Sequence, residues 1–377
     1  MLPSPVALFL MRVLIVPDKF KGSLTAPRAA RAIARGWLSA RPGDRLDLLP
    51  MSDGGDGFGE ILGRLLGARR RGVASLDAAH RPIRAPWWWC AGSKTAIVDS
   101  AGVIGLATLP RGEFHPFQLD TFGLGKVLLA AAGAGAAKCV VGIGGSSTND
   151  GGFGLARALG WRFLDTHGCE LDEWWKLPQL AAIRQPPLPF HCPLVVAADA
   201  LNPLLGRAGC TRVYGPQKGL RPQDFLWAEH CLRRLASLAP SPPNLDLAGV
   251  PGAGAAGGLG FGLMAFAGGK VKPGFDFFAR HVQLDKRVRA ARLVITGEGA
   301  IDAQTRMGKG VGQIARCCAR LGVPCVGLAG TVDPSIKVSN LFVRACALTE
   351  ITTPQRAQSQ AARFLALLAA ETARRVC

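Results

Sequence analysis

Five apolar runs along this chain each end in a short turn that combines glycine with a carboxylate. Glycine lets backbone N–H groups approach a ligand closely, and a carboxylate can hold a metal ion or accept a proton. One such turn is common, whereas five of them indicate an enzyme that handles phosphate with a metal ion. The acids of these turns are Asp18, Asp53, Asp56, Asp150, Asp199, Glu298 and Asp302.

The densest of these turns is Thr296–Thr305. Phosphoryl transfer needs a divalent cation that bridges phosphates, positive charge, and a base at the acceptor hydroxyl. For any single acid here, an ordinary strand-to-helix turn with capping acids remains an open alternative. The cluster as a whole favours a site for nucleotide and Mg²⁺, with Glu298 and Asp302 as metal ligands and with Gly297, Gly299, Gln304 and Lys309 beside them.

The other turns offer a cation and two candidate bases. Lys21 follows a strand end, where it can neutralise a phosphate as a point charge. Asp199 ends a hydrophobic strand, which is a costly place for a carboxylate without a task. Asp53 is the second candidate base, although an Asx turn would explain it equally well. A solvated turn remains the alternative for Asp18–Gly22, and an ordinary turn for Asn202.

These turns require strands to position them, and the two chain ends supply the pattern of a parallel sheet. Apolar runs at 13–16 and 46–49 alternate with helical segments at 25–39 and 56–66, and the same rhythm resumes at 293. The simplest architecture is a five-stranded, flavodoxin-like α/β domain formed by residues 11–68 and 286–377. A second α/β domain with a mixed sheet is then inserted at 69–285, and residues 1–10 form a dispensable tail before Met11.

This topology predicts which acids lie together. At a switch point of such a sheet the first strand neighbours the strand after the insertion, which places Asp18 and Lys21 next to Glu298 and Asp302. We also expect the turn at Asp53 to belong to the split domain. The turns at Gly144 and Asp199 would face it from the insert across one cleft.

Composition excludes several classes of protein. The 377 residues include 11 Cys without C-x-x-C pairing, which fits a reducing cytosol, and no apolar run reaches membrane-spanning length. The net charge of +19 comes from scattered residues apart from Arg69–Arg71, which a solvated, Arg-rich surface explains better than nucleic-acid binding. This positive field would also attract anionic substrates. The match of 252–257 to G-x-G-x-x-G follows a poor strand, and a loop that packs closely or lines a phosphate explains it better than a dinucleotide site.

Seven segments in order resemble the bacterial-type glycerate kinase family (glycerate kinase type 1), over nearly the whole chain from Arg12 to about Gly330. The segments are 17–26, 51–57, 142–152, 199–206, 215–219, 251–260 and 296–305. The resemblance implies ATP- and Mg²⁺-dependent phosphorylation of D-glycerate, usually to 2-phosphoglycerate, in organic-acid catabolism. It also implies a cytoplasmic monomer or homodimer that needs no nucleic acid or membrane.

Within this reading, Asp199 or Asp53 accepts the hydroxyl proton and Lys21 neutralises the transferring phosphoryl group. Substrate or nucleotide binding falls to Asp18, Lys19, Gly144, Gly145, Ser146, Thr148, Asn149, Asn202, Lys218, Gly297, Glu298, Gly299, Gln304 and Lys309. The chain departs from the family pattern at Lys19, Asp56, Asp99, Lys126 and Gly310, which puts substrate range in question. A kinase of another small hydroxy acid and a basic nucleic-acid- or anion-binding protein remain alternatives.

Overall fold

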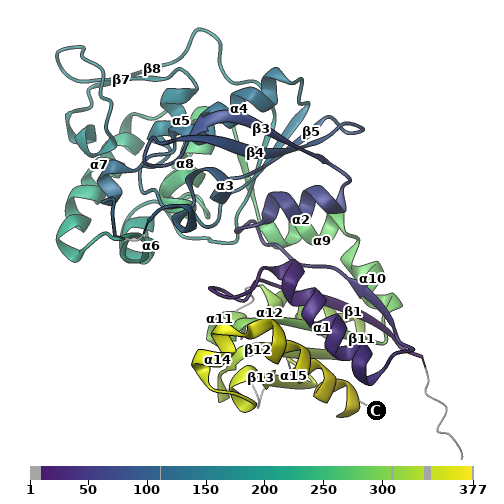
Figure 1. Cartoon of the computed structure of the whole chain (residues 1–377). Coiled ribbons are helices and arrows are strands. Elements are labelled where there is room, and N and C mark those ends of the chain that lie inside the picture. The colour runs from purple at the N-terminus through teal and green to yellow at the C-terminus, as the bar shows by residue number, and fades with distance from the viewer. Residues whose placement is uncertain (1–9, 111, 307–309, 335–340, 376–377) are drawn as a thin grey trace, which may run out of the picture. The chain divides into compact units, whose positions relative to one another are not determined.

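The computed structural model describes residues 10–110, 112–306, 310–334 and 341–375, and its contacts divide the chain into two units (Figure 1). Unit 1 runs to Ser52 and resumes at Phe278, and unit 2 comprises Asp53–Phe277. The boundaries therefore fall before those expected at 68/69 and 285/286. The physical reason is helix α2 (Phe58–Leu65), whose Gly59 and Gly63 pack directly on Trp88 of unit 2.

Unit 1 contains the predicted five-stranded parallel sheet. Its strand order is β13-β12-β11-β1-β2, the arrangement of flavodoxin-like sheets, so the predicted fold class is confirmed. Its strands are β1 (Arg12–Pro17), β2 (Arg45–Leu48), β11 (Leu293–Ile301), β12 (Cys325–Val332) and β13 (Arg344–Ala347). Its helices are α1 (Ala26–Ala40), α10 (Leu284–Ala290), α11 (Ala303–Arg306), α12 (Val311–Leu321), α14 (Pro354–Ser359) and α15 (Ala361–Arg375).

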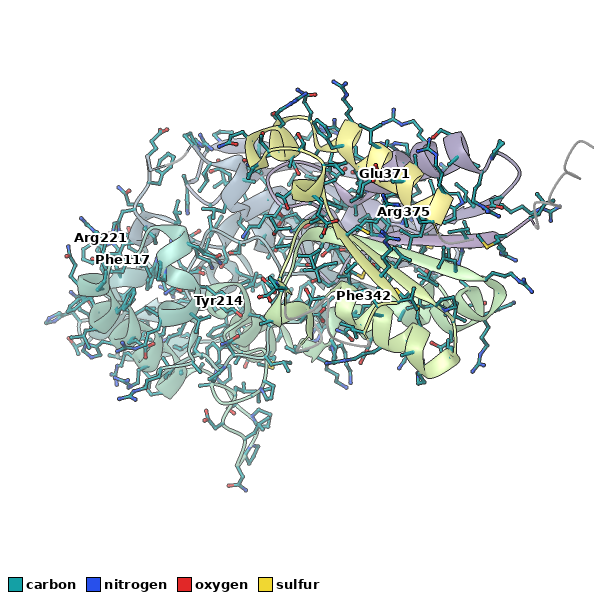
Figure 2. The ribbon with its side chains drawn as sticks, turned by 90° about the horizontal axis from the view of Figure 1, so that it is seen from below. Phe117, Tyr214, Arg221, Phe342, Glu371 and Arg375 are labelled. Atoms are coloured by element: carbon teal, nitrogen blue, oxygen red, sulfur yellow. The ribbon has the colours of Figure 1, made fainter. Side chains whose placement is uncertain are left out.

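One face of this sheet carries the core formed by α1 and α15. Val13 and Ile15 of β1 pack there with Trp37 of α1 and with Leu365 of α15. The two helices touch so closely that a side chain at Gly36 would overlap the carbonyl oxygen of Ala366, 1.9 Å away. Figure 2 shows α15 with Glu371 and Arg375 labelled near its C-terminal end.

Strand β11 is longer than expected. The sequence predicts a strand over 293–295 followed by a turn, but the strand continues to Ile301. Its second half pairs with β12, with Glu298 beside Ala329 and Ile301 beside Val332. Gly297 allows this close pairing, because a side chain there would lie 2.0 Å from the carbonyl oxygen of Leu328.

Unit 2 is built on a six-stranded mixed sheet in the order β10-β9-β6-β5-β4-β3. The pairs β3–β4 and β4–β5 are antiparallel, and the other pairs are parallel. The strands are β3 (Arg69–Leu76), β4 (Pro82–Cys90), β5 (Thr95–Asp99), β6 (Lys138–Gly142), β9 (Leu194–Ala197) and β10 (Lys270–Lys272), with a separate hairpin of β7 (Arg162–Leu164) and β8 (Ala182–Arg184).

Helices cover this sheet and lead chain segments back to its carboxyl edge (Figure 1). They are α2, α3 (Ala101–Ile104), α4 (Phe122–Gly133), α5 (Phe153–Ala158), α6 (Cys210–Lys218), α7 (Phe225–Leu238), α8 (Ala255–Ala267) and α9 (Gly274–His281), the last of which continues into unit 1. Within the described ranges, none of the helices combines the length and the apolar character that a membrane span requires.

Candidate functional site

The carboxyl ends of β6 and β9 in unit 2 meet the turn Asp53–Gly57. The Gly144 N–H, just after β6, donates to the carbonyl oxygen of Gly54 at 2.9 Å. Gly54 has φ +96°, and a side chain there would lie 2.5 Å from the carbonyl oxygen of Ala197 at the end of β9. Asp53 forms an Asx turn, since its Oδ1 accepts from the Gly55 N–H at 3.1 Å. The turn therefore presents Asp53 at the edge where α/β sheets bind ligands.

Asp199 is the neighbour of Asp53 at this edge. Its Oδ1 accepts a hydrogen bond from the Phe275 N–H at 3.2 Å, while its Oδ2 is buried and has no hydrogen-bond partner among the described residues. Burial, together with the charge of Asp53, raises the pKa of Asp199 to about 7. A carboxyl group with this pKa and a free oxygen can accept a proton at neutral pH.

Asp99, at the end of β5, holds the Asp53–Gly57 turn in place. Its carboxylate accepts from the N–H groups of Gly57 (2.9 Å), Gly59 (3.4 Å) and Ala101 (3.1 Å). Burial, and secondarily the charge of Asp56, raises the pKa of Asp99 to about 7. Asp99 is not among the site residues predicted from the sequence, although it ends an apolar strand in the same way as Asp199.

The turn after β6 divides into an edge part and a buried part. Gly144 and Gly145 lie at the edge, and a side chain at Gly145 would overlap the carboxylate of Asp56. Ser146, Thr148 and Asn149 were predicted to bind ligand, but their side chains are buried. The Ser146 and Thr148 hydroxyls bond to each other at 2.9 Å, and Asn149 donates to the Thr211 hydroxyl at 3.1 Å.

Asp150 and Lys218 fix this buried part from two sides. Asp150 accepts from the hydroxyl of Thr121 (2.7 Å) and from the N–H groups of Thr121 (3.0 Å) and Gly154 (2.9 Å), and burial raises its pKa to about 6. Lys218 Nζ donates to the carbonyl oxygen of Thr148 at 2.6 Å, and burial lowers its pKa to about 8. In this structure Lys218 therefore holds the turn, and Asp150, one of the seven turn acids, acts beside it as an internal acceptor.

The glycine-rich segment 252–258 packs against the same turn. Ala256, Gly257 and Gly258 have φ of +57°, +73° and +85°, and a side chain at Gly257 would lie 2.0 Å from the carbonyl oxygen of Thr148. This close packing agrees with the simpler explanation of the G-x-G-x-x-G match. Asn202, predicted to bind substrate, is hydrogen-bonded within the unit: it accepts from the Tyr214 hydroxyl at 2.6 Å and donates to the carbonyl oxygen of Ala208 at 2.8 Å (Tyr214 is labelled in Figure 2).

Unit 1 presents a second group of predicted residues, at the carboxyl ends of β1 and β11. The Asp18 N–H donates to the carbonyl oxygen of Gly297, and Asp18 Oδ1 accepts from the Lys19 N–H at 2.7 Å. Lys21 is exposed on the following turn, and its backbone N lies 3.1 Å from the Cβ position at Gly299. The predicted juxtaposition of the first strand and the strand after the insertion is thus present.

Two carboxylates converge at Gly310. Asp18 Oδ2 and Glu298 Oε2 lie 3.5 and 4.0 Å from the Cβ position at this glycine, whose φ of +50° is one that residues with a side chain rarely adopt. The Thr305 hydroxyl donates to Glu298 Oε1 at 2.8 Å and accepts from the Asp302 N–H at 3.2 Å. This hydroxyl thereby links Glu298 to Asp302.

The carboxylates in unit 1 fit a Mg²⁺ ion that is bound by only a few protein ligands. Over the described ranges no three His, Cys, Asp or Glu side chains gather as a metal cage. Mg²⁺ commonly uses only one or two carboxylates and completes its shell with water and phosphate oxygens, which Glu298 and Asp18 can accommodate. Two residues predicted to bind nucleotide or substrate cannot be placed in this site: Lys309 lies outside the described residues, and the side chain of Gln304 is not described.

Comparisons with known proteins match this chain over most of its length. The model of the Glycerate kinase family matches residues 13–377. Glycerate kinase of Bacillus subtilis (strain 168) is 37% identical over 327 residues, covering 86% of each chain, and glycerate 2-kinase of Escherichia coli K12 is 33% identical over 333 residues, covering 87% of each. A crystal structure described as that of a candidate glycerate kinase 2 from Salmonella typhimurium LT2 superposes with a TM-score of 0.79 at 31% identity, covering 97% of this chain and 98% of the other.

Proposed function

Because this chain belongs to the glycerate kinase family, whose members are phosphotransferases acting on an alcohol group, we propose that it phosphorylates D-glycerate at the 2-hydroxyl with ATP. The relative named glycerate 2-kinase supports the 2-position over the 3-position. We extend the proposal to a cytosolic enzyme of glycerate catabolism that acts as a monomer or homodimer.

The observation that carries the mechanism is the free oxygen of Asp199. An acceptor hydroxyl must lose its proton as it attacks the γ-phosphorus, and Oδ2 is a buried acceptor without a partner among the described residues. A pKa of about 7 leaves this carboxyl group ionised in a large fraction of molecules at neutral pH. Asp53 supports this role because its charge contributes to the raised pKa.

Unit 1 contains the residues that we propose to neutralise the negative charge of the phosphates. Lys21 is an exposed cation beside a strand end and supplies a point charge for a phosphoryl group. Glu298, with Asp18 or Asp302, would hold Mg²⁺, and the metal when bound neutralises phosphate oxygens as a Lewis acid. The Thr305 hydroxyl fixes Glu298 for this task through its 2.8 Å hydrogen bond.

Incubating the protein with ATP, Mg²⁺ and D-glycerate, and measuring ADP release, tests the activity. NMR of the product assigns the phosphorylated carbon, and a spectrum of 3-phosphoglycerate alone would overturn the 2-position. Lactate and glycolate serve as matched hydroxy acids, and turnover with them but not with D-glycerate would reassign the substrate. Absence of turnover with all three acids, together with salt-sensitive retention on DNA, would favour a basic binding protein instead.

A further inference from the structure

The amino edge of the unit 1 sheet carries arginines in register on neighbouring strands. Arg12 of β1 pairs directly with Arg45 of β2, so the two side chains project from the same face of the sheet. On the other side of β1, Arg292 precedes β11, and its N–H donates to the carbonyl oxygen of Arg12 at 2.8 Å. Like charges directly opposite each other destabilise a sheet, so this arrangement needs a compensating charge.

The nearby carboxylates do not supply that compensation. Both oxygens of Asp47 lie 2.9 Å from Arg287 Nη1, which commits this acid to α10. Asp44 is held by Arg41 and by the indole N–H of Trp37, which belongs to the core on the α1 face. Arg12, Arg45 and Arg292 have no ion pair within the described ranges of the chain, and all three are exposed.

Arg12 and Arg45 line a shallow, open hollow in the surface. A depression of about 430 Å³ is lined by Arg12, Arg45, Leu46, Asp47 and Arg287, and Figure 1 shows α10 alongside β1 and β11 at this part of unit 1. Three of its five lining residues are arginines and only one is apolar. The lining therefore fits a small, strongly anionic ligand and not an apolar one.

We propose that this hollow, the arginine pocket, binds a phosphate-bearing anion, either a free inorganic phosphate or polyphosphate or the phosphate tail of a nucleotide. The guanidinium fork matches two phosphate oxygens, and Arg12 and Arg45 together match a ligand with more than one negative charge. The pocket lies at the opposite end of β1 from Asp18, about 17–20 Å along a six-residue strand. It is therefore separate from the unit 1 acids assigned above, and it does not depend on the proposed function.

The test measures pyrophosphate binding to the full chain by isothermal titration calorimetry. Arg12→Gln/Arg45→Gln is expected to raise the dissociation constant of the pocket by at least about tenfold, because two charge-assisted contacts are lost. The matched control is Arg28→Gln/Arg31→Gln, which removes the same charge from exposed positions on α1 and should change the constant less than about twofold. Equal losses in both variants would show general attraction to a basic protein and overturn the proposal.

A second experiment, NMR spectroscopy, tests where on the protein pyrophosphate binds. With ¹⁵N-labelled arginine, pyrophosphate should shift the side-chain Nε–Hε resonances that disappear in Arg12→Gln and Arg45→Gln, and unshifted resonances would refute the pocket. Inorganic phosphate, pyrophosphate and ADP, each added without metal, distinguish a free anion from a nucleotide tail as the ligand. The glycerate kinase activity of Arg12→Gln/Arg45→Gln without added pyrophosphate should equal that of the parent, which keeps this result independent of the assigned reaction.

Discussion

Replacing Asp199 with asparagine separates the chemical role of this carboxyl group from its effect on stability. Asparagine keeps the size of the side chain and an acceptor for the Phe275 N–H, but it cannot take up a proton at neutral pH. Loss of a general base lowers turnover by about 10²–10⁴-fold, so we expect Asp199→Asn to lose at least a hundredfold in kcat.

Stability should change in the opposite direction. The pKa of Asp199 rises from its ordinary 3.8 to about 7, so the folded state holds this proton more tightly than the unfolded state. The ionised group therefore costs stability above about pH 7, and the cost fades as the pH falls towards 4. Three pKa units correspond to about 4 kcal/mol, which partial exposure of the side chain reduces to about 1–3 kcal/mol. Asp199→Asn should gain this amount at pH 8.

The assay pairs ADP release with urea unfolding at pH 8 and pH 5. Asp276→Asn is the matched control, because it removes an exposed charge that also acts on Asp199 but leaves the carboxyl group in place. Its turnover should stay within about threefold of the parent. Near-normal kcat in Asp199→Asn would refute the base assignment, whereas lost activity together with lost stability at pH 8 would indicate a structural role instead.

Three further predictions follow from the same unit. The kcat/KM for D-glycerate should rise through about pH 7 as Asp199 loses its proton, and a profile flat from pH 5 to 9 would contradict this. Gly54→Ala should lower the free energy of unfolding in urea by about 2–4 kcal/mol, because its Cβ would lie 2.5 Å from the Ala197 carbonyl oxygen. In the control Gly67→Ala, φ is also positive (+63°) but the space is open, so the loss should be only about 1–2 kcal/mol. Lys218→Met should cost about 1–3 kcal/mol, because the buried Thr148 carbonyl oxygen loses its donor. Lys176→Met removes a half-exposed lysine that pairs with Glu173 and should leave stability almost unchanged, so equal losses in the two variants would remove Lys218 from its holding role.

The central strands β1, β11 and β12 of unit 1 could be predicted from the sequence because each contains a continuous apolar run. Val13–Val16 is buried on both faces, so the unbroken apolar run itself indicates a strand of a parallel sheet, and the pairing of β1 with β11 follows from the topology of such sheets. The same logic predicted Asp18 next to Glu298 and marked Asp199 as an acid at a strand end. The apolar pattern is a local property of the sequence, and the topology of parallel sheets is a general rule, so both can be applied to one sequence alone.

Packing between distant residues could not be predicted in this way. The residues around Gly59 and Gly63 give no sign that both glycines pack against Trp88. Because of this contact, α2 and Asp53 belong to unit 2. Likewise Ser146 and Thr148 have the composition of a ligand loop, but their hydroxyls bond to each other inside the unit. Asn149 donates to Thr211, while its buried Oδ1 has no partner among the described residues. Residue type shows what a side chain can bind, and only the surrounding packing decides whether ligand or protein is its partner.

The pairing of β1 with β11 also constrains the order in which the chain can fold. Val16 and Thr296 are 280 positions apart, and the Thr296 hydroxyl donates to the Val16 carbonyl oxygen at 2.7 Å. At translation rates of about 5–20 residues per second, β1 emerges from the ribosome roughly 15–60 s before its partner strand. Unit 2 is complete by then, whereas β1 has only β2 as an available partner strand. Strand β1 thus becomes a central strand only late in synthesis, and until then its edge towards β11 is an unpaired apolar edge of the kind that promotes aggregation.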